Sequence, residues 1–98
     1  MYVLVLYDIS HNGARRQVSN ACLDMGLKRL QHSVFLGHAS PRQREQLSQA
    51  LRLILGERPG VIHVMPLHIS NIEQMIEIYV PKPPEEALPQ DLEPEEEV

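Results

Sequence analysis

The chain has 98 residues, a mass of 11.2 kDa and a formal charge of −4, which leaves room for one small domain. It contains no run of about 18 apolar residues, and Met1 to Asp8 include no basic segment ahead of an apolar core. We therefore expect a cytoplasmic protein without a membrane span or a secretory signal. The single Cys22 excludes an internal disulfide, a thiolate zinc finger and an iron–sulfur ferredoxin.

The charge is unevenly distributed between two parts of the chain. Residues 81–98 hold five of the eight prolines, seven of the thirteen acidic residues and one of the nine Lys and Arg residues. Their net charge is −6, whereas residues 1–80 carry a net charge of +2. We predict a folded, mildly basic domain over residues 1–80 and an acidic, proline-rich disordered tail over residues 81–98. The tail could solubilise the protein, dock onto a partner, or shield the basic surface from phosphates.

The first predicted element is a strand over residues 2–8, because YVLVLYD is a nearly continuous run of β-branched, aromatic and other apolar residues. Alternation places one set of side chains on one face of the strand and a second set on the other: Tyr2, Leu4, Leu6 and Asp8, against Val3, Val5 and Tyr7. The pattern leaves open which of the two faces is covered by the rest of the protein.

Six further elements are predicted in chain order. A turn cluster over residues 10–13 and helical apolar spacing up to Met25 predict a helix of about three turns that stops at Gly26. Residues 28–38 are expected to be extended, as a short strand followed by a longer one. A capping box that begins at Ser40 predicts a second helix, which ends at Gly56. Residues 61–67 and 73–80 then predict two more strands.

This order of elements is that of an α+β fold, the ferredoxin-like βαββαβ sandwich, with an additional C-terminal strand. Both helices of such a sandwich lie on one face of an antiparallel sheet. The other face of the sheet would then be exposed in a monomer, and an exposed apolar face favours a partner. We expect a two-fold homodimer formed through the sheet faces.

Asp8 is the first candidate for chemistry, because a carboxylate ends an otherwise apolar strand. It could simply lie at an exposed strand end and cap the following turn. Alternatively, a two-fold axis could bring two Asp8 carboxylates together, and a divalent ion such as Mg²⁺ would relieve their repulsion.

The basic residues form short groups at the starts of predicted elements, where backbone donors also favour phosphate oxygens: Arg15 and Arg16, Lys28 and Arg29, and Arg42 and Arg44. Each group could be an ordinary solvated edge, or it could bind nucleic-acid phosphates without reading sequence. The five histidines lack the spacing of zinc ligands and are interpreted as structural or surface residues: His11, His32, His38, His63 and His68.

The segments YDIS, GLKRLQHSVFLG and VIHVMPL together resemble the CRISPR-associated Cas-two (Cas2) family over about residues 1 to 80. The resemblance implies a homodimer in which Asp8 of both chains meets a divalent metal, Mg or Mn, near the two-fold axis. It also implies that four residues lie around that site: Tyr7, Arg15, Arg29 and Phe35. Two positions differ from the usual family pattern, with His32 in place of a Tyr and Gln17 at a helix position where some members carry Arg.

The family resemblance implies a CRISPR adaptation protein of antiviral defence that works with the spacer integrase. One reading is a metal-dependent endonuclease acting on RNA or double-stranded DNA, with Asp8 catalytic and the arginines positioning the backbone. The other reading is a non-catalytic bridge that holds two integrase dimers on nucleic acid. A ferredoxin-like regulatory domain that binds a small metabolite fits the fold but does not explain the SVF motif.

Overall fold

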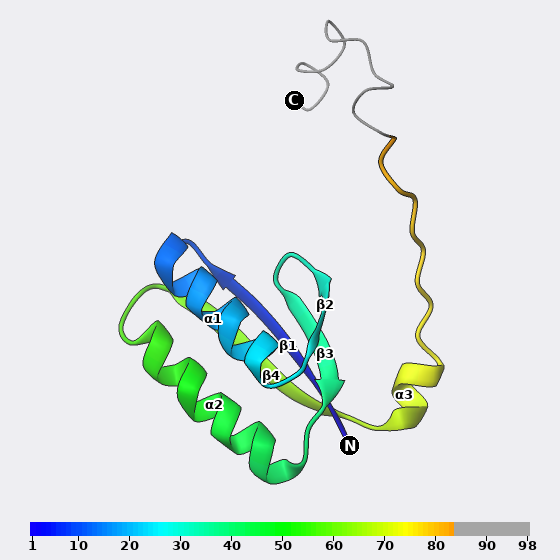
Figure 1. Cartoon of the computed structure of the whole chain (residues 1–98), viewed down its shortest axis with the longest axis horizontal. Coiled ribbons are helices and arrows are strands. Elements are labelled where there is room, and N and C mark those ends of the chain that lie inside the picture. Colours follow the sequence, from blue (N-terminus) through cyan, green and yellow to red (C-terminus); the bar gives the residue numbers. More distant parts are fainter. Residues whose placement is uncertain (84–98) are drawn as a thin grey trace, which may run out of the picture.

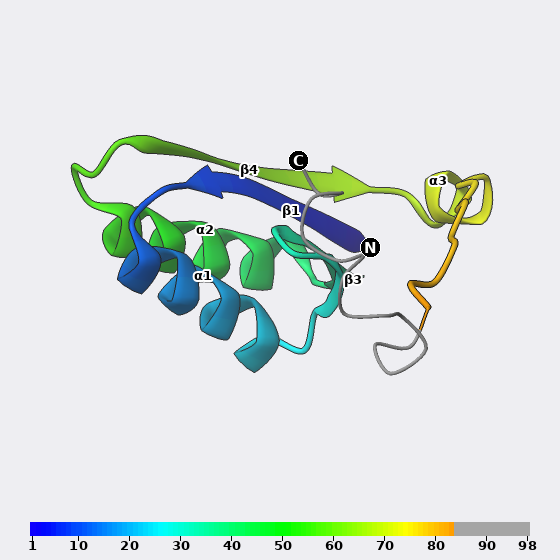
Figure 2. The same cartoon turned by 90° about the horizontal axis from the view of Figure 1, so that it is seen from above.

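Four antiparallel strands form one sheet in the order β2-β3-β1-β4, and two long helices lie against one face of it (Figures 1 and 2). The computed structural model describes residues 1–83. Its elements are β1 Tyr2–Ile9, α1 Asn12–Asp24, β2 Lys28–Gln31, β3 Val34–His38, α2 Pro41–Leu55, β4 Gly60–Leu67 and α3 Ile69–Glu73. The predicted α+β ferredoxin-like order βαββαβ is confirmed by these elements.

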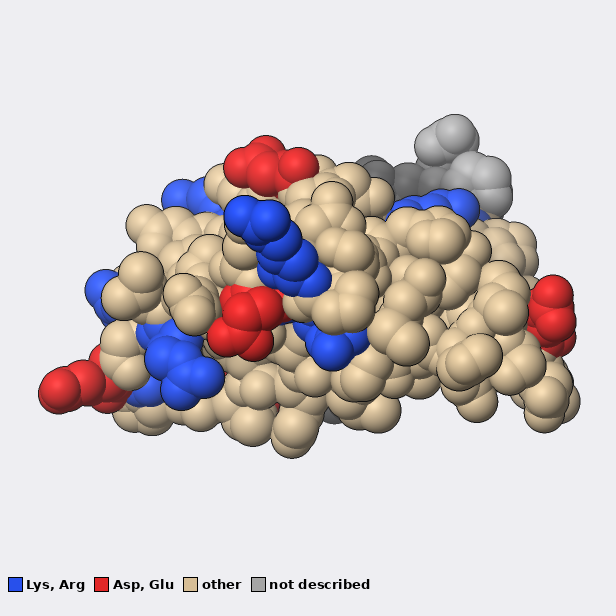
Figure 3. Space-filling view, turned by 90° about the horizontal axis from the view of Figure 1, so that it is seen from below, with Lys and Arg blue, Asp and Glu red and all other residues tan. Residues whose placement is uncertain are grey.

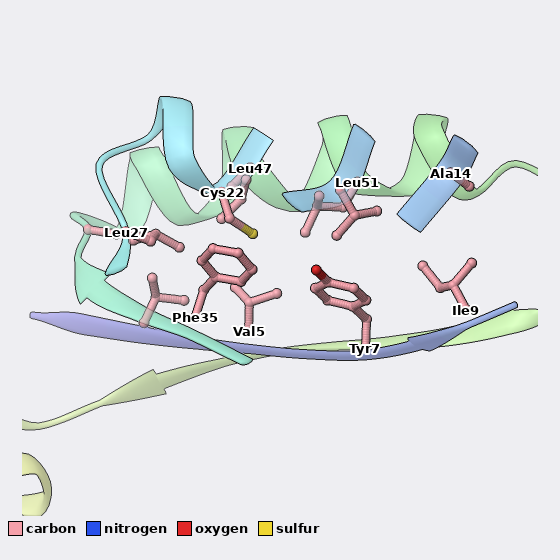
Figure 4. Packing of buried hydrophobic residues seen from close by; sticks show 12 residues of the cluster. Val5, Tyr7, Ile9, Ala14, Cys22, Leu27, Phe35, Leu47 and Leu51 are labelled. Carbon is pink, nitrogen blue, oxygen red and sulfur yellow. The ribbon is translucent and has the colours of Figure 1, made fainter. Parts of the chain in front are cut away.

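The core lies between β1 and the two helices (Figure 4). Its members alternate along β1 and follow helical spacing along α1 and α2: Val3, Val5, Tyr7, Ile9, Ala14, Val18, Cys22, Leu47 and Leu51. Phe35 of β3 is fully buried beside them. The helices therefore cover the face of β1 that carries Val5 and Tyr7, which resolves the alternative that the sequence left open.

Both long helices begin and end where their terminal residues predict. His11 caps α1 by accepting a hydrogen bond from the backbone N–H of Ala14, at 3.0 Å. Gly26 follows α1 with φ of 92°, a left-handed conformation that glycine adopts without a Cβ clash. At α2, Ser40 and Gln43 form the predicted capping box, with hydrogen bonds of 3.1 and 2.9 Å.

The capping box gives a stability prediction. Replacing Ser40 by Ala leaves the N–H of Gln43 without its side-chain acceptor, and we expect unfolding to become easier by about 1 kcal/mol. Urea denaturation followed by circular dichroism measures this difference. Ser48→Ala, the same substitution within α2, serves as the control and should not destabilise the protein, because alanine is the better helix former there. Equal losses in both variants would contradict a capping role.

The second face of the sheet is not covered by any described helix, and we call it the open face. Its register places Leu4 between Leu36 and Met65, and Leu6 between Val34 and His63. Figure 3 shows the molecule with the helices along its upper edge and the sheet along its lower edge, so that the open face is seen edge-on. The open face is thus largely apolar, as the exposed-face argument from the sequence predicted.

The additional C-terminal strand predicted over residues 73–80 is wrong for the single chain. Glu73 ends α3, a short helix that the sequence analysis did not predict, and residues 75–83 form no strand. The alternation of Ile76, Ile78 and Val80 is genuine, but a strand also needs a neighbouring edge with which to exchange hydrogen bonds. The segment instead runs away from the sheet (Figure 1), and these three side chains are 83 to 88% exposed.

The predicted disordered tail over 81–98 lies almost wholly outside the described residues, since the description ends at residue 83. The division into a domain over 1–80 and a tail therefore stays a prediction. Among residues 1–83, no helix is long and apolar enough to cross a membrane.

Candidate nucleic-acid interface and metal site

Asp8 lies near the end of β1, on the open face of the sheet. It pairs with Val61 of β4, and its side chain is exposed. It does not cap α1, because His11 occupies the cap position of that helix. The Asp8 carboxylate therefore lies at the margin of a largely apolar surface. The neighbouring pair on the same face, Leu6 with His63, lies two residues along the strand.

The donors available to a metal in one chain are few. In the described residues, no three His, Cys, Asp or Glu side chains gather closely enough to hold an ion. Asp8 offers hard carboxylate oxygens, the ligand type that Mg²⁺ and Mn²⁺ prefer, and Mg²⁺ commonly keeps several water ligands beside one or two carboxylates. The chemistry of Asp8 thus fits such an ion, provided that a second chain contributes a second carboxylate.

The basic side chains gather on the other side of β1. A cavity of about 300 Å³ lies between the first half of α1 and β2, and we call it the arginine pocket. It is lined by Tyr7, Asn12, Arg15, Arg16, Ser19, Arg29 and His32. The lining holds three guanidinium groups and no acidic side chain, so its net charge is strongly positive.

Neutral partners hold two of these arginines in place. Arg15 donates to the backbone oxygen of Ile9 at 3.1 Å and to the side-chain oxygen of Asn12. Arg29 donates to the hydroxyl of Ser19, and its guanidinium lies 5.0 Å from the ring centre of Phe35. Because each partner is uncharged, the positive charges are oriented without being neutralised.

Tyr7 forms the inner wall of the arginine pocket and is only 7% exposed. Burial raises the pKa of its hydroxyl, as does the neighbouring Cys22, while Arg29, Ser19 and Arg15 oppose that rise. Burial likewise raises the pKa of the Cys22 thiol to about 11. Both groups therefore stay protonated near neutral pH, and neither is an activated nucleophile.

The structure brings some of the predicted site residues together and separates others. Tyr7 and Arg29 share the arginine pocket with Arg15 and Arg16, and the ring of Phe35 packs against the Arg29 guanidinium. Asp8 alternates with Tyr7 along β1, so the sheet separates its carboxylate from the pocket. The remaining basic residues lie elsewhere. Lys28 pairs with Leu36 and shares the open face, whereas Arg42 and Arg44 begin α2 at the opposite end of the helix layer (Figure 1).

Three pocket residues were missed by reasoning from the sequence: Asn12, Ser19 and His32. The signal for the first two was the helical spacing around Arg15, since residues three and four positions apart lie on the same side of a helix. His32 follows β2 in a turn, and no spacing in the sequence connects it with α1.

Comparisons with known proteins agree with this fold. Residues 1–75 match the sequence family described as CRISPR associated protein Cas2. A protein of Desulforudis audaxviator named CRISPR-associated endoribonuclease Cas2 is 37% identical over 89 residues, 89% of this chain and 84% of that relative. The crystal structure of Streptococcus pyogenes Cas2 at pH 6.5 is similar with a TM-score of 0.71 and 26% identity, covering 81% of this chain and 100% of that chain.

One longer relative is also similar. A protein of Thermoproteus tenax named CRISPR-associated endonuclease Cas1/endonuclease Cas2 fusion is 30% identical over 84 residues. The match covers 86% of this chain and 31% of the fusion protein. The family match over most of the described residues, the similar relatives and the shared fold lead to one conclusion: this chain is a member of the CRISPR-associated Cas2 family.

Proposed function

We propose that this chain forms a homodimeric, metal-dependent endonuclease that cleaves RNA or double-stranded DNA during CRISPR adaptation in antiviral defence. The observation that carries the proposal is the exposed carboxylate of Asp8 on the uncovered, largely apolar face of the sheet. The relative from Desulforudis audaxviator is named an endoribonuclease, which supports the reaction class.

Two surfaces support a homodimer. The open face presents Leu4, Leu6, Val61 and Met65, of which the last two are each 43% exposed. β4 is an edge strand of the sheet and has unpaired backbone groups along its outer side. The extended apolar segment over residues 75–80 of a second copy could pair with that edge. Covering both surfaces would remove apolar area from water that a monomer leaves exposed.

In the proposed dimer, Asp8 of each chain would hold a shared Mg²⁺ or Mn²⁺. The ion, when bound, would supply Lewis acidity at the scissile phosphate. The protein's own residues bind and orient the polynucleotide. Arg15, Arg16 and Arg29 would contact phosphate oxygens at the arginine pocket, and Lys28 would do so from the edge strand β2, at the margin of the open face.

Metal removal tests this function. Purified protein treated with a chelator should lose cleavage of an RNA and of a DNA duplex, and Mg²⁺ or Mn²⁺ should restore it. The expected loss is at least about 100-fold, because a divalent ion contributes several kcal/mol of charge stabilisation. Gel analysis of end-labelled substrates measures the rate. Cleavage that continues unchanged in chelator would contradict a metal-dependent reaction.

A second candidate function is a non-catalytic bridge between dimers of the spacer integrase on nucleic acid. The Thermoproteus tenax fusion supports it, since one polypeptide there joins parts named Cas1 and Cas2. The positively charged pocket residues would serve this role equally well, because bridging requires phosphate binding and no reaction. The two functions differ in the role of Asp8, which must hold the metal in the endonuclease and has no catalytic role in the bridge.

Duplex binding should be sequence-tolerant and should weaken with salt. With roughly four phosphate contacts, raising monovalent salt from about 50 to about 200 mM should lower the affinity by about 100-fold. Fluorescence anisotropy with two unrelated duplexes measures the slope, and Arg16→Gln should make it shallower. Asp8→Asn, in contrast, should leave this binding intact. A flat salt response would exclude phosphate contacts as the source of affinity.

A further inference from the structure

The arginine pocket is an open hollow on the helix side of the sheet, and three guanidinium groups surround it. Its volume is about 300 Å³. Tyr7 closes it from behind, and the first half of α1 and the turn at His32 bound its sides. A phosphate group with an attached sugar fits such a volume.

The charges of the pocket also exceed what one phosphodiester brings. Three guanidinium groups line it, and no lining residue is acidic. A phosphodiester carries one negative charge, whereas a phosphate monoester carries nearly two near neutral pH. Arg15 and Arg29 are already oriented by Ile9, Asn12 and Ser19, so little side-chain ordering remains to be done when an anion binds.

We infer that the arginine pocket binds a phosphate monoester, as carried by the end of a nucleic-acid strand or by a free nucleotide. A monoester brings nearly two negative charges to the three guanidinium groups and a diester brings one, so the charge of the lining favours the monoester. The inference deepens the proposed nucleic-acid function by adding recognition of strand ends. It does not depend on Asp8 or on a metal, because the sheet separates Asp8 from the pocket.

Binding of matched oligoribonucleotides tests the inference. One sequence is prepared with a 5′-phosphate, with a 3′-phosphate and with hydroxyl groups at both ends, and affinity is measured by anisotropy in chelator. At least one phosphorylated form should bind about 10-fold more tightly than the hydroxyl form, as one additional charge-assisted contact provides. Adenosine monophosphate is then added as a competitor. Its competition identifies a free nucleotide as a ligand, whereas competition by the phosphorylated strand alone identifies the strand end.

Substitutions place the effect in the pocket. Arg29→Gln should abolish the preference for the phosphorylated form. Arg16→Gln should reduce it and serves as the second variant if Arg29→Gln does not fold, because Arg16 is exposed. Arg58→Gln removes the same charge after the end of α2, outside the pocket, and should keep the full preference. Equal affinity for all three strands, or a preference that survives both pocket substitutions, would overturn the inference. Loss of metal-dependent cleavage in Asp8→Asn, by contrast, leaves it untouched.

Discussion

Replacing Asp8 by Asn should lower the cleavage rate of the proposed dimer by at least about 100-fold, because the amide removes the charge with which each chain would hold the shared ion. The side chain is exposed and keeps its shape, so folding should not change. End-labelled RNA and duplex DNA, incubated with Mg²⁺ at saturating protein, give the rate.

Two controls make this result specific to Asp8. Asp24→Asn removes an exposed carboxylate at the end of α1 and should leave cleavage unchanged. Asp8→Asn itself should remain dimeric, since the apolar side chains of the open face supply most of the proposed interface and are unchanged. Unchanged cleavage by a dimeric Asp8→Asn protein would assign the activity to another site or to a contaminant. Loss of cleavage with retained duplex binding would show that Asp8 is needed for the endonuclease reaction and not for the duplex binding on which a bridge depends.

Replacing Leu4 by Lys should convert the proposed dimer into monomers at micromolar concentration. Leu4 lies at the centre of the open face between Leu36 and Met65, so a dimer would bury two unpaired ammonium groups there. Such burial costs on the order of 3 kcal/mol or more, which weakens association by at least about 100-fold. Sedimentation at several concentrations measures the change.

The control for this substitution is Leu53→Lys. Leu53 is 82% exposed on α2, on the far side of the helix layer from the open face, and its replacement should leave the oligomeric state unchanged. Circular dichroism of Leu4→Lys should match the parent protein, because the side chain already borders solvent in the monomer. A Leu4→Lys protein that remains fully dimeric would show that the open face is not the interface.

Local sequence signals were sufficient to predict the main elements. The apolar run of β1, the capping box at Ser40 and the glycines after both helices each depend on neighbouring residues alone, and the structure confirms all of them. The prediction of a strand failed at residues 73–80. The alternation there also depends on neighbouring residues alone, but a strand needs a pairing partner from elsewhere in the protein. A strand pattern says nothing about which chain supplies the neighbouring edge.

The candidate site also combines signals that the local sequence carries with contacts that it does not. Alternation already placed Tyr7 and Asp8 on opposite faces of the first strand, yet the sequence could not tell which face the helices cover. The structure assigns Tyr7 to the helix side, together with Arg15 and Arg29. Ser19 follows Arg15 by helical spacing, whereas His32 joins them only because α1 packs beside β2, a contact between distant parts of the chain.

The central claim, that two chains share one divalent ion between their Asp8 carboxylates, is tested most directly by crystals grown with Mn²⁺. The anomalous signal of manganese should give a single peak on a two-fold axis, about 2.0–2.4 Å from an Asp8 oxygen of each chain. Chains related by no such axis, or Asp8 carboxylates that face apart with no peak between them, would contradict it.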